Sequence, residues 1–342
     1  MHKSRRKSKP TRSVPIIALL VAMIGVGLFG LHLWEKNELE KEALEIEARS
    51  SDSDLLPEQL TVYYQGNWYQ LRNDLKSYLL LGIDKFEDTA QTTDGAAINK
   101  QQSDFLLLMI ADENDRSYTA LQLNRDTMCE VQILGKNGQV ISTQTMQLAL
   151  SHTYGSGGKD SCRNSVKAVS RLLYDVPIDH YFAVTMDAIP VLNDLVGGVT
   201  VTIEEDLTAI DPSFTEGRTV LLKGDQSLLF VRTRMQVSDG TNISRMSRQR
   251  TYMDALYSQM SRRLRESSGF ALTLADTLAP YMVSDLITDE MAQLADQLKD
   301  YRFNGIITVE GTADYSGHFA EFYPDETDLQ SKVIRLFFEL QK

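Results

Sequence analysis

Cysteine and histidine are scarce in this chain of 342 residues. The two cysteines, Cys129 and Cys162, cannot form a disulfide framework or a cysteine-based zinc site, although a single bridge between them stays open. The five histidines form no H-E-x-x-H motif, and no G-x-S-x-G motif occurs. These absences disfavour zinc enzymes and hydrolases that use a serine nucleophile.

Positive charge is also scarce beyond the N-terminus. The net charge is −12, and six basic residues precede residue 13, so the rest of the chain is more acidic still. Such a surface disfavours binding of nucleic acid through its phosphate backbone. Gly155–Lys159 departs from a P-loop in its glycine spacing, and Asp160 replaces the Ser/Thr, which disfavours ATP binding.

A long hydrophobic run extends from Val14 to Trp34. Its 21 residues contain no Asp, Glu, Lys or Arg, and a helix of about that length crosses a hydrocarbon core of about 30 Å. The basic segment before it predicts a cytoplasmic tail over residues 1–13 and an extracellular remainder. A cleaved signal peptide is the alternative, but the run is longer than usual and no small-x-small site follows. We therefore expect a single-pass protein of the cell membrane.

Residues 35–57 are expected to form an extracellular stalk and linker, because Glu35–Arg49 has helical charge spacing and Ser50–Pro57 is polar. Residues 58–342 form one domain in which short apolar runs and helical patterns are mixed. Leu60–Tyr69 is expected to form an edge strand or a hairpin. The other expected strands are Tyr78–Gly82, Phe105–Ile110, Tyr118–Leu123, Tyr181–Thr185, Val199–Ile203, Leu228–Arg232 and Gly305–Val309. The expected helices are Ser165–Leu173, Ala188–Leu195, Ser247–Arg265, Gly269–Met282, Asp289–Leu298 and Thr327–Leu340.

Several of these strands are apolar throughout, which is typical of a sheet covered on both faces. The pattern predicts an α/β fold in which a central mixed β-sheet is sandwiched by helices, an α-β-α arrangement.

Five arginines and no lysine occur within Val231–Arg250, where Asp239 is the single acidic residue. The planar guanidinium binds phosphate through two hydrogen bonds and keeps its charge when buried, so a phosphate or diphosphate ligand is one interpretation. Surface ion pairs with the many carboxylates are the other. The arginines are Arg232, Arg234, Arg245, Arg248 and Arg250.

Three acidic residues lie where an expected strand meets a loop: Asp84, Asp104 and Asp126, the last beside Arg125. Ligand sites of open α/β sheets gather outside strand ends, so these side chains could converge. Carboxylate oxygens suit Mg²⁺ or Mn²⁺, with substrate phosphate completing the coordination shell. Each Asp taken singly is also a common turn residue or helix cap.

The order of seven motifs resembles that of the LytR-CpsA-Psr family of bacterial cell-envelope proteins. The resemblance covers about Tyr78 to Leu256. The motifs are Tyr78-L-L-L-G-I-Asp84, Ser103-Asp104, Leu123-N-Arg125-Asp126-Thr127, Val176-P-I-D-H-Tyr181, Asp194-L-V-G-G-Val199, Leu222-K-G-D-Q-S-L-L-F-V-R-T-Arg234 and Arg245-M-S-Arg248-Gln249.

The resemblance implies a phosphotransferase of a Gram-positive envelope that moves a glycopolymer, such as teichoic acid or capsular polysaccharide, from a polyprenyl diphosphate carrier onto peptidoglycan. It also implies an apolar tunnel for the lipid between sheet and helices. By position, Asp84 and Asp104 would hold Mg²⁺, and Arg125, Asp126, Arg232 and Arg234 would be catalytic. Asp126 would either orient Arg125 or serve as the base. The diphosphate would be bound by Arg125, Arg232, Arg234, Arg245, Arg248 and Gln249.

Three positions depart from the family pattern. Phe86 stands where an arginine is frequent, Asn242 stands where an aspartate is usual, and Glu87–Gln102 lengthens the segment between the two metal-binding positions. Two other functions remain open: a polyprenyl diphosphate hydrolase, and a membrane-bound regulatory or lipid-binding protein without catalysis.

Overall fold

The computed structural model describes residues 60–84, 91–93, 95–233, 241–267, 270–287 and 301–341, together with Glu290, Leu294 and Leu298. The predicted cytoplasmic tail, membrane anchor and stalk lie outside the described residues. Within the described part of the chain, no helix is long and apolar enough to cross a membrane.

A six-stranded sheet forms the centre of the domain, in the order β13-β10-β3-β6-β7-β14. Strands β10 and β3 are parallel, as are β14 and β7, while the other neighbours are antiparallel. The mixed sheet is therefore confirmed. Its strands are β3 (Leu75–Ile83), β6 (Ser103–Asp112), β7 (Ser117–Leu123), β10 (His180–Thr185), β13 (Met282–Ser284) and β14 (Arg302–Thr308).

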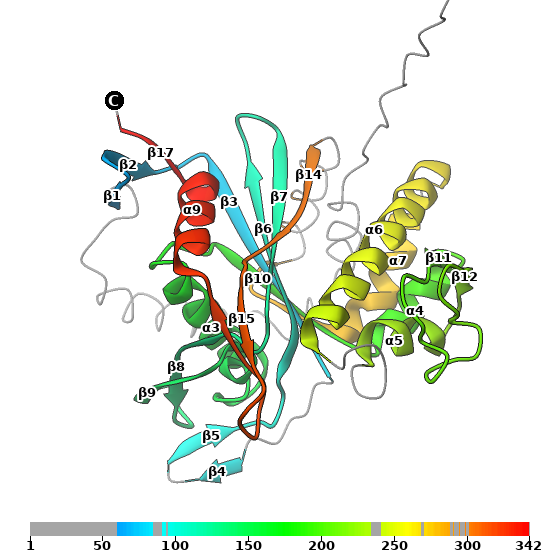
Figure 1. Cartoon of the computed structure of the whole chain (residues 1–342), viewed down its shortest axis with the longest axis horizontal. Helices are drawn as coiled ribbons and strands as arrows, with labels where there is room; N and C mark the ends of the chain where they lie inside the picture. The colour runs from blue at the N-terminus through cyan, green and yellow to red at the C-terminus, as the bar shows by residue number, and fades with distance from the viewer. Residues whose placement is uncertain are drawn as a thin grey trace, which may run out of the picture.

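Helices cover both faces of this sheet (Figure 1). Side chains alternate between the faces of a strand, so Leu80 joins the core under one group of helices and its neighbours Leu79 and Leu81 join the other core. The first group is α4 (Ala188–Leu195), α5 (Asp225–Arg232), α6 (Asn242–Glu266) and α7 (Phe270–Leu278); the second is α3 (Gly158–Leu172) and α9 (Glu326–Phe337).

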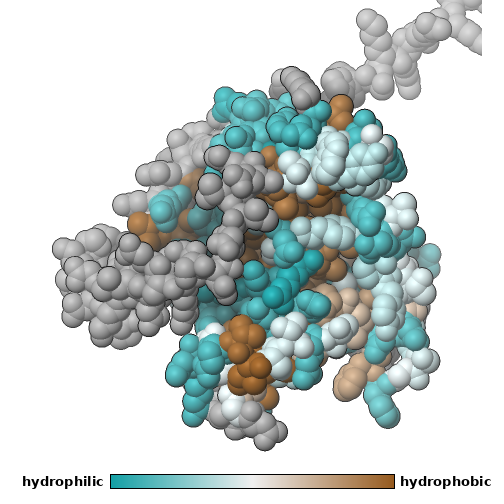
Figure 2. All heavy atoms as spheres, turned by 90° about the vertical axis from the view of Figure 1, so that its left-hand side faces the viewer, coloured by the Kyte–Doolittle hydropathy of each residue, from teal (hydrophilic) through white to brown (hydrophobic). Residues whose placement is uncertain are grey.

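Smaller sheets surround the central one. Strands β1 (Thr61–Tyr64), β2 (Asn67–Leu71) and β17 (Phe338–Leu340) form a three-stranded sheet. The two-stranded pairs are β4 (Gln91–Thr93) with β5 (Ala96–Ile98), β8 (Met128–Leu134) with β9 (Val140–Gln147), β11 (Val199–Thr202) with β12 (Thr219–Leu222), and β15 (Gly311–Asp314) with β16 (Glu321–Pro324). Figure 2 shows one face of the molecule, on which hydrophilic residues predominate and hydrophobic ones lie in several separate places.

One predicted strand is wrong. Leu228–Arg232 lies in helix α5, which begins after Gly224 with Asp225 in its first turn. A short apolar run has no periodicity that separates a strand from one buried helical turn. The correction places Arg232 at the C-terminal end of a helix.

Other boundaries differ from the prediction. The helix expected from Ser165 begins at Gly158, and the last three residues of the expected terminal helix form strand β17. Helix α6 begins at Asn242 because the Thr241 side chain caps it by accepting from the Ser244 N–H. The helix expected to reach Met282 ends at Leu278, ahead of Pro280. Most of the helix expected at 289–298 lies outside the described residues.

Candidate functional site

Asp84 and Asp104 leave the same edge of the central sheet. Strands β3 and β6 are antiparallel, and Ile83 at the end of β3 pairs with Ser103 at the start of β6. A register shift at this point leaves Asp104 as the extra residue of a β-bulge, a device that redirects a side chain beside a site. The Asp84 and Asp104 side chains are 47% and 21% exposed, so solvent reaches both carboxylates.

Arg125 joins this edge from the loop that follows β7. Its Nη1 donates to Asp104 Oδ1, and its Nη2 donates to Gln102 Oε1 at 2.5 Å. Its Nε lies 3.5 Å from Oδ1 of Asp126, which is buried. The structure thus brings Asp104, Arg125 and Asp126 together, with Asp126 placed to orient the guanidinium. Gln102 is a contact that sequence analysis missed.

Arg245 approaches the same carboxylate from the first turn of α6. Its Nη1 lies 3.7 Å from Asp104 Oδ1, and its side chain is only 7% exposed. Nε and Nη2 donate to Asn242 Oδ1 at 3.1 and 2.6 Å, and Asn242 Nδ2 donates to Asn124 Oδ1 at 2.5 Å. Asn242 therefore holds Arg245 with a neutral acceptor, in place of the aspartate that the family pattern predicts here.

Arg232 pairs with the other carboxylate. Its Nη2 lies 2.7 Å from Asp84 Oδ1, and both side chains are about half exposed. Exposed pairs of this kind contribute about 0–1 kcal/mol, so an anionic ligand can displace the carboxylate at small cost. Arg232 is also favoured by its place at the negative end of the α5 dipole.

Arg248 is held in a different environment. Its guanidinium donates to the backbone oxygens of Phe230 (3.2 Å) and Thr233 and to Glu205 Oε1 (2.8 Å). Its side chain is only 6% exposed. The structure therefore has Arg248 bound to the C-terminal end of α5, where it satisfies carbonyls that the helix leaves open.

Gln249 belongs to a chain of hydrogen bonds that connects α6, β7 and α5. Its Nε2 donates to the Val231 backbone oxygen at 3.3 Å, and Gln122 Nε2 donates to its Oε1 at 3.3 Å. Arg250 Nη1 in turn donates to Gln122 Oε1 at 2.9 Å. Sequence analysis missed Gln122, although a glutamine inside an apolar strand was a usable signal.

Some predicted positions cannot be placed. Arg234 and Phe86 lie outside the described residues. The insertion Glu87–Gln102 is described from Gln91, apart from Asp94; it forms the β4–β5 hairpin and ends at the Arg125 contact.

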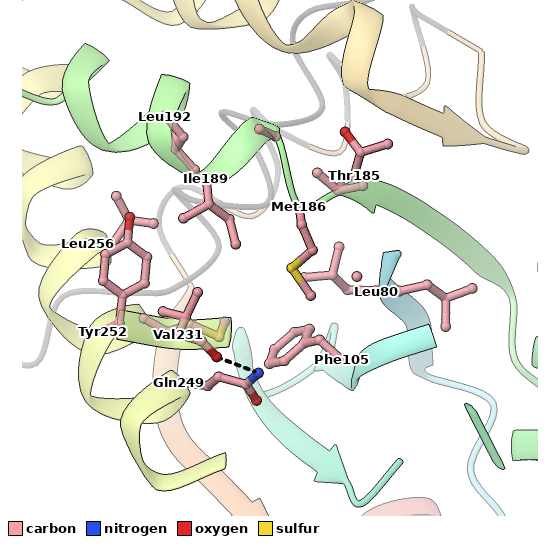
Figure 3. A pocket seen from close by; sticks show the side chains of 15 residues that line it. Leu80, Phe105, Thr185, Met186, Ile189, Leu192, Val231, Gln249, Tyr252 and Leu256 are labelled. Atoms are coloured by element: carbon pink, nitrogen blue, oxygen red, sulfur yellow. Dashed lines mark hydrogen bonds between the residues drawn. The ribbon is translucent and has the colours of Figure 1, made fainter. Parts of the chain in front are cut away.

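An apolar cavity lies beside the charged groups, between the sheet and helices α4, α5 and α6. It holds about 680 Å³ of empty space, counting the mouth open to solvent. Figure 3 shows Phe105, Met186 and Ile189 converging on this space, with the bond from Gln249 to Val231 at its side. The lining residues include Leu80, Gly82, Leu192, Tyr252, Met253 and Leu256.

The carboxylates of the edge fit a magnesium ion in their donor chemistry. No group of three or more His, Cys, Asp and Glu side chains gathers anywhere in the described part of the chain. The protein would then offer Asp84 and Asp104, and phosphate oxygens would complete the shell, as is usual for Mg²⁺.

The two cysteines do not form a disulfide; both are free and buried. Burial raises the pKa of Cys129 to about 12. Cys162 Sγ lies 3.8 Å from His152 Nε2, and the His152 side chain is fully buried. A neutral thiol beside a buried imidazole indicates a packing role.

Known proteins match most of this chain. The sequence profile of the LytR_cpsA_psr family covers residues 34–333. A Bacillus cereus (strain AH820) protein named "Polyisoprenyl-teichoic acid--peptidoglycan teichoic acid transferase TagU" is 29% identical over 262 residues, which is 75% of this chain and 77% of that protein. A relative of the same name from Halalkalibacterium halodurans is 29% identical over 218 residues, and the match spans 64% of this chain and 63% of that relative.

The fold is shared with a solved structure described as "TagT bound to LIIa-WTA". The TM-score is 0.56 at 22% identity, over 77% of this chain and 90% of that chain. This likeness concerns the fold; the profile match over nearly the whole sequence shows the relationship, and the chain belongs to the LytR_cpsA_psr family.

Proposed function

We propose that this protein is a phosphotransferase that moves an anionic or capsular glycopolymer from a polyprenyl diphosphate carrier onto peptidoglycan. The names of the relatives, which describe transfer of teichoic acid from a polyisoprenyl carrier to peptidoglycan, support the reaction class.

One observation carries the proposal: the apolar cavity and the charged cluster are adjoining parts of the same elements. Phe105 lines the cavity and follows Asp104, and Val231 lines the cavity and precedes Arg232. A ligand that fills both must have an apolar chain joined directly to an anionic group. A polyprenyl diphosphate has that form.

The charged residues of the site would have different roles, according to their charge and exposure. Arg125 and Arg245 are held close to Asp104 and would bind the diphosphate in a prearranged site, while Arg232 would leave Asp84 to join them. Asp84 and Asp104 would hold Mg²⁺ (or Mn²⁺), whose charge offsets that of the diphosphate. We propose diphosphate contacts for Arg234, Arg248 and Gln249 as well, from the family pattern.

The transfer step needs no covalent protein intermediate. A peptidoglycan hydroxyl oxygen bonds to the glycan-side phosphorus, the bridging P–O bond breaks, and polyprenyl phosphate leaves with that electron pair. The hydroxyl proton is released to solvent. Positioning and charge stabilisation supply most of the rate in such phosphoryl transfers.

The site would lie at the outer surface of a membrane. Val14–Trp34 is proposed as the anchor, with residues 1–13 in the cytoplasm and 35–57 as the stalk. The carrier lipid would then be met at the bilayer surface, and the energy for transfer would come from its diphosphate bond.

A reconstituted reaction tests the proposal. The full chain in detergent is given a polyprenyl diphosphate-linked glycopolymer with Mg²⁺, with and without peptidoglycan. The expected result is glycopolymer joined to peptidoglycan when the acceptor is present, and an unreacted donor when it is absent. Release of free glycopolymer at the same rate with and without acceptor would identify a hydrolase, and binding of the lipid without turnover would identify a non-catalytic protein.

A further inference from the structure

The hairpin β15–β16 and its loop expose three aromatic side chains. Phe319 is 74% exposed, Tyr315 51% and Tyr323 48%. Exposed aromatic residues that gather on one short segment mark an interaction surface more often than scattered ones do.

This hairpin is attached directly to the charged site. The Phe322 N–H donates to the Asp126 backbone oxygen at 2.8 Å, and Phe322 forms a parallel bridge with Thr127. Gln147 Nε2 contacts both the Ala320 backbone oxygen (2.5 Å) and Asp126 Oδ1 (3.4 Å). Ala320 and Phe322, at the loop end of the hairpin, are thus held beside Asp126, the residue that follows Arg125. A ligand on the outer face of the hairpin would therefore lie near the arginines.

The outer face of the hairpin combines ring surface with hydrogen-bond acceptors. Thr312 pairs with Tyr323, and Asp314 pairs with Glu321 two residues along, so these four side chains share one face. The Tyr323 hydroxyl donates to Glu321 Oε2 at 2.5 Å, which agrees with this placement. A ring that can stack on the C–H face of a sugar, next to carboxylates that accept from sugar hydroxyls, suits a carbohydrate.

The charge of the segment decides which carbohydrate fits. From Glu310 to Asp328 the chain has six acidic residues and no Lys or Arg. An anionic glycopolymer would be repelled here, and so would an anionic lipid surface. A sugar chain without phosphate would not be repelled.

The hairpin and the apolar cavity lie on opposite sides of the central sheet. The cavity is bounded by α4, α5 and α6. The hairpin instead forms a bridge with Thr127, which immediately precedes β8, and Cys129 and Val131 of β8 belong to the core on the α3 side (Figure 1). Attacking and leaving oxygens stand roughly in line in phosphoryl transfer. An acceptor arriving from the hairpin side would face a lipid leaving on the cavity side.

We propose that β15–β16 is the binding surface for the acceptor, and that it recognises the uncharged sugar backbone of a glycan strand through Phe319 and Tyr323. The inference rests on the proposed transferase function, because it names the acceptor's place in that reaction.

The test compares Phe319→Ala/Tyr323→Ala with Tyr63→Ala/Trp68→Ala, a control pair of exposed aromatic residues on β1 and β2 (63% and 54% exposed). These strands precede β3, whose far end carries the site. Binding of a neutral N-acetylglucosamine tetrasaccharide to the full chain in detergent is measured by calorimetry. The loss of two stacked rings should weaken sugar binding about tenfold in the hairpin variant, while the control variant binds as the wild type does.

The same variants are assayed for transfer over a range of acceptor concentrations. The hairpin variant should raise the acceptor KM about tenfold and leave the donor KM unchanged. Equal sugar binding by the hairpin variant and the wild type would overturn the proposal, as would a wild type that binds lipid vesicles or a protein here and no sugar. If the wild type binds the sugar through the hairpin but transfers nothing, the proposed function fails and the sugar surface stands.

Discussion

Two arginines show how the charged cluster is arranged for a diphosphate before the ligand binds. Arg245 is almost fully buried and fixed by Asn242, while Arg232 is half exposed and held by one carboxylate. The first is prearranged, and the second can move to the ligand. Such a division lets the protein bind an anion with little reorganisation at the centre of the site.

Replacing Arg232 or Asp104 with alanine tests this division. Each change removes a charge from the proposed site, so kcat/KM for transfer from a purified lipid donor should fall by at least about 100-fold. Arg232→Lys should recover part of the rate, because it keeps the charge but loses the planar fork. The control is Arg302→Ala, which breaks an exposed pair with Asp115 outside the site. Normal transfer by both alanine variants would show that the site is assigned wrongly.

His152 gives a separate prediction about stability. Burial lowers the pKa of His152 from 6.5 to about 4, so the folded protein binds fewer protons than the unfolded chain between these values. Its contribution is fully present above pH 6.5 and is lost as the pH falls toward 4, a change of about 3 kcal/mol. Urea unfolding at pH 4.5 and pH 7 should show a smaller difference for His152→Leu than for the wild type. The same difference in both proteins would contradict the prediction; His318→Leu, at an exposed position, is the control.

The convergence of Asp84, Asp104 and Arg125 could be predicted from sequence, because each ends or begins an apolar run and strand ends meet at a sheet edge. The bulge at Asp104 could not, since it depends on which strand pairs with β6 and in what register. Asn124 and Gln102 were missed for a similar reason. Their partners lie far along the chain, and only tertiary packing brings them into contact.

Among the elements, α5 matters most for the site. Its apolar run was expected to be a strand, and as a helix it places Arg232 at a C-terminal end that Arg248 and Gln249 hold in position. The family to which the motifs with these arginines point was identified correctly in sequence. The secondary structure of Leu228–Arg232 was not, because one buried turn of helix and one buried strand have the same composition.

The cavity between the sheet and α4 can be filled to test its role. Ile189→Trp adds a large side chain where the lipid would lie. It should raise the KM for a long-chain polyprenyl donor about tenfold, since several buried methylene groups at about 0.8 kcal/mol each would lose their site. A donor with a chain of only a few carbons should be affected much less. Equal loss with both donors would indicate a damaged fold and no lipid site.

For the whole molecule, the prediction from sequence was right about the mixed sheet with helices on both faces, and a solved structure shares this fold. The apolar runs were sufficient for this prediction, because strands covered on both faces consist almost entirely of apolar residues. The two faces of the sheet differ, since the cavity lies on one and the aromatic hairpin on the other. This difference depends on long-range pairing that no local pattern encodes.

Removal of residues 1–59 tests the proposed anchor. The shortened protein should keep its transfer rate with a detergent-solubilised donor. With the donor in a bilayer the rate should fall about 100-fold, because the tether no longer raises the effective concentration of the site at the membrane. An unchanged rate in bilayers would mean that the N-terminal segment has no such role.

The chemistry of the lipid product tests the central claim most directly. The full chain is incubated with a polyprenyl diphosphate-linked glycopolymer, Mg²⁺ and peptidoglycan, and both products are examined by mass spectrometry. Attack at the glycan-side phosphorus predicts polyprenyl monophosphate and a muropeptide that carries the glycopolymer through one phosphate. Polyprenyl diphosphate together with a muropeptide linked without phosphate would contradict it.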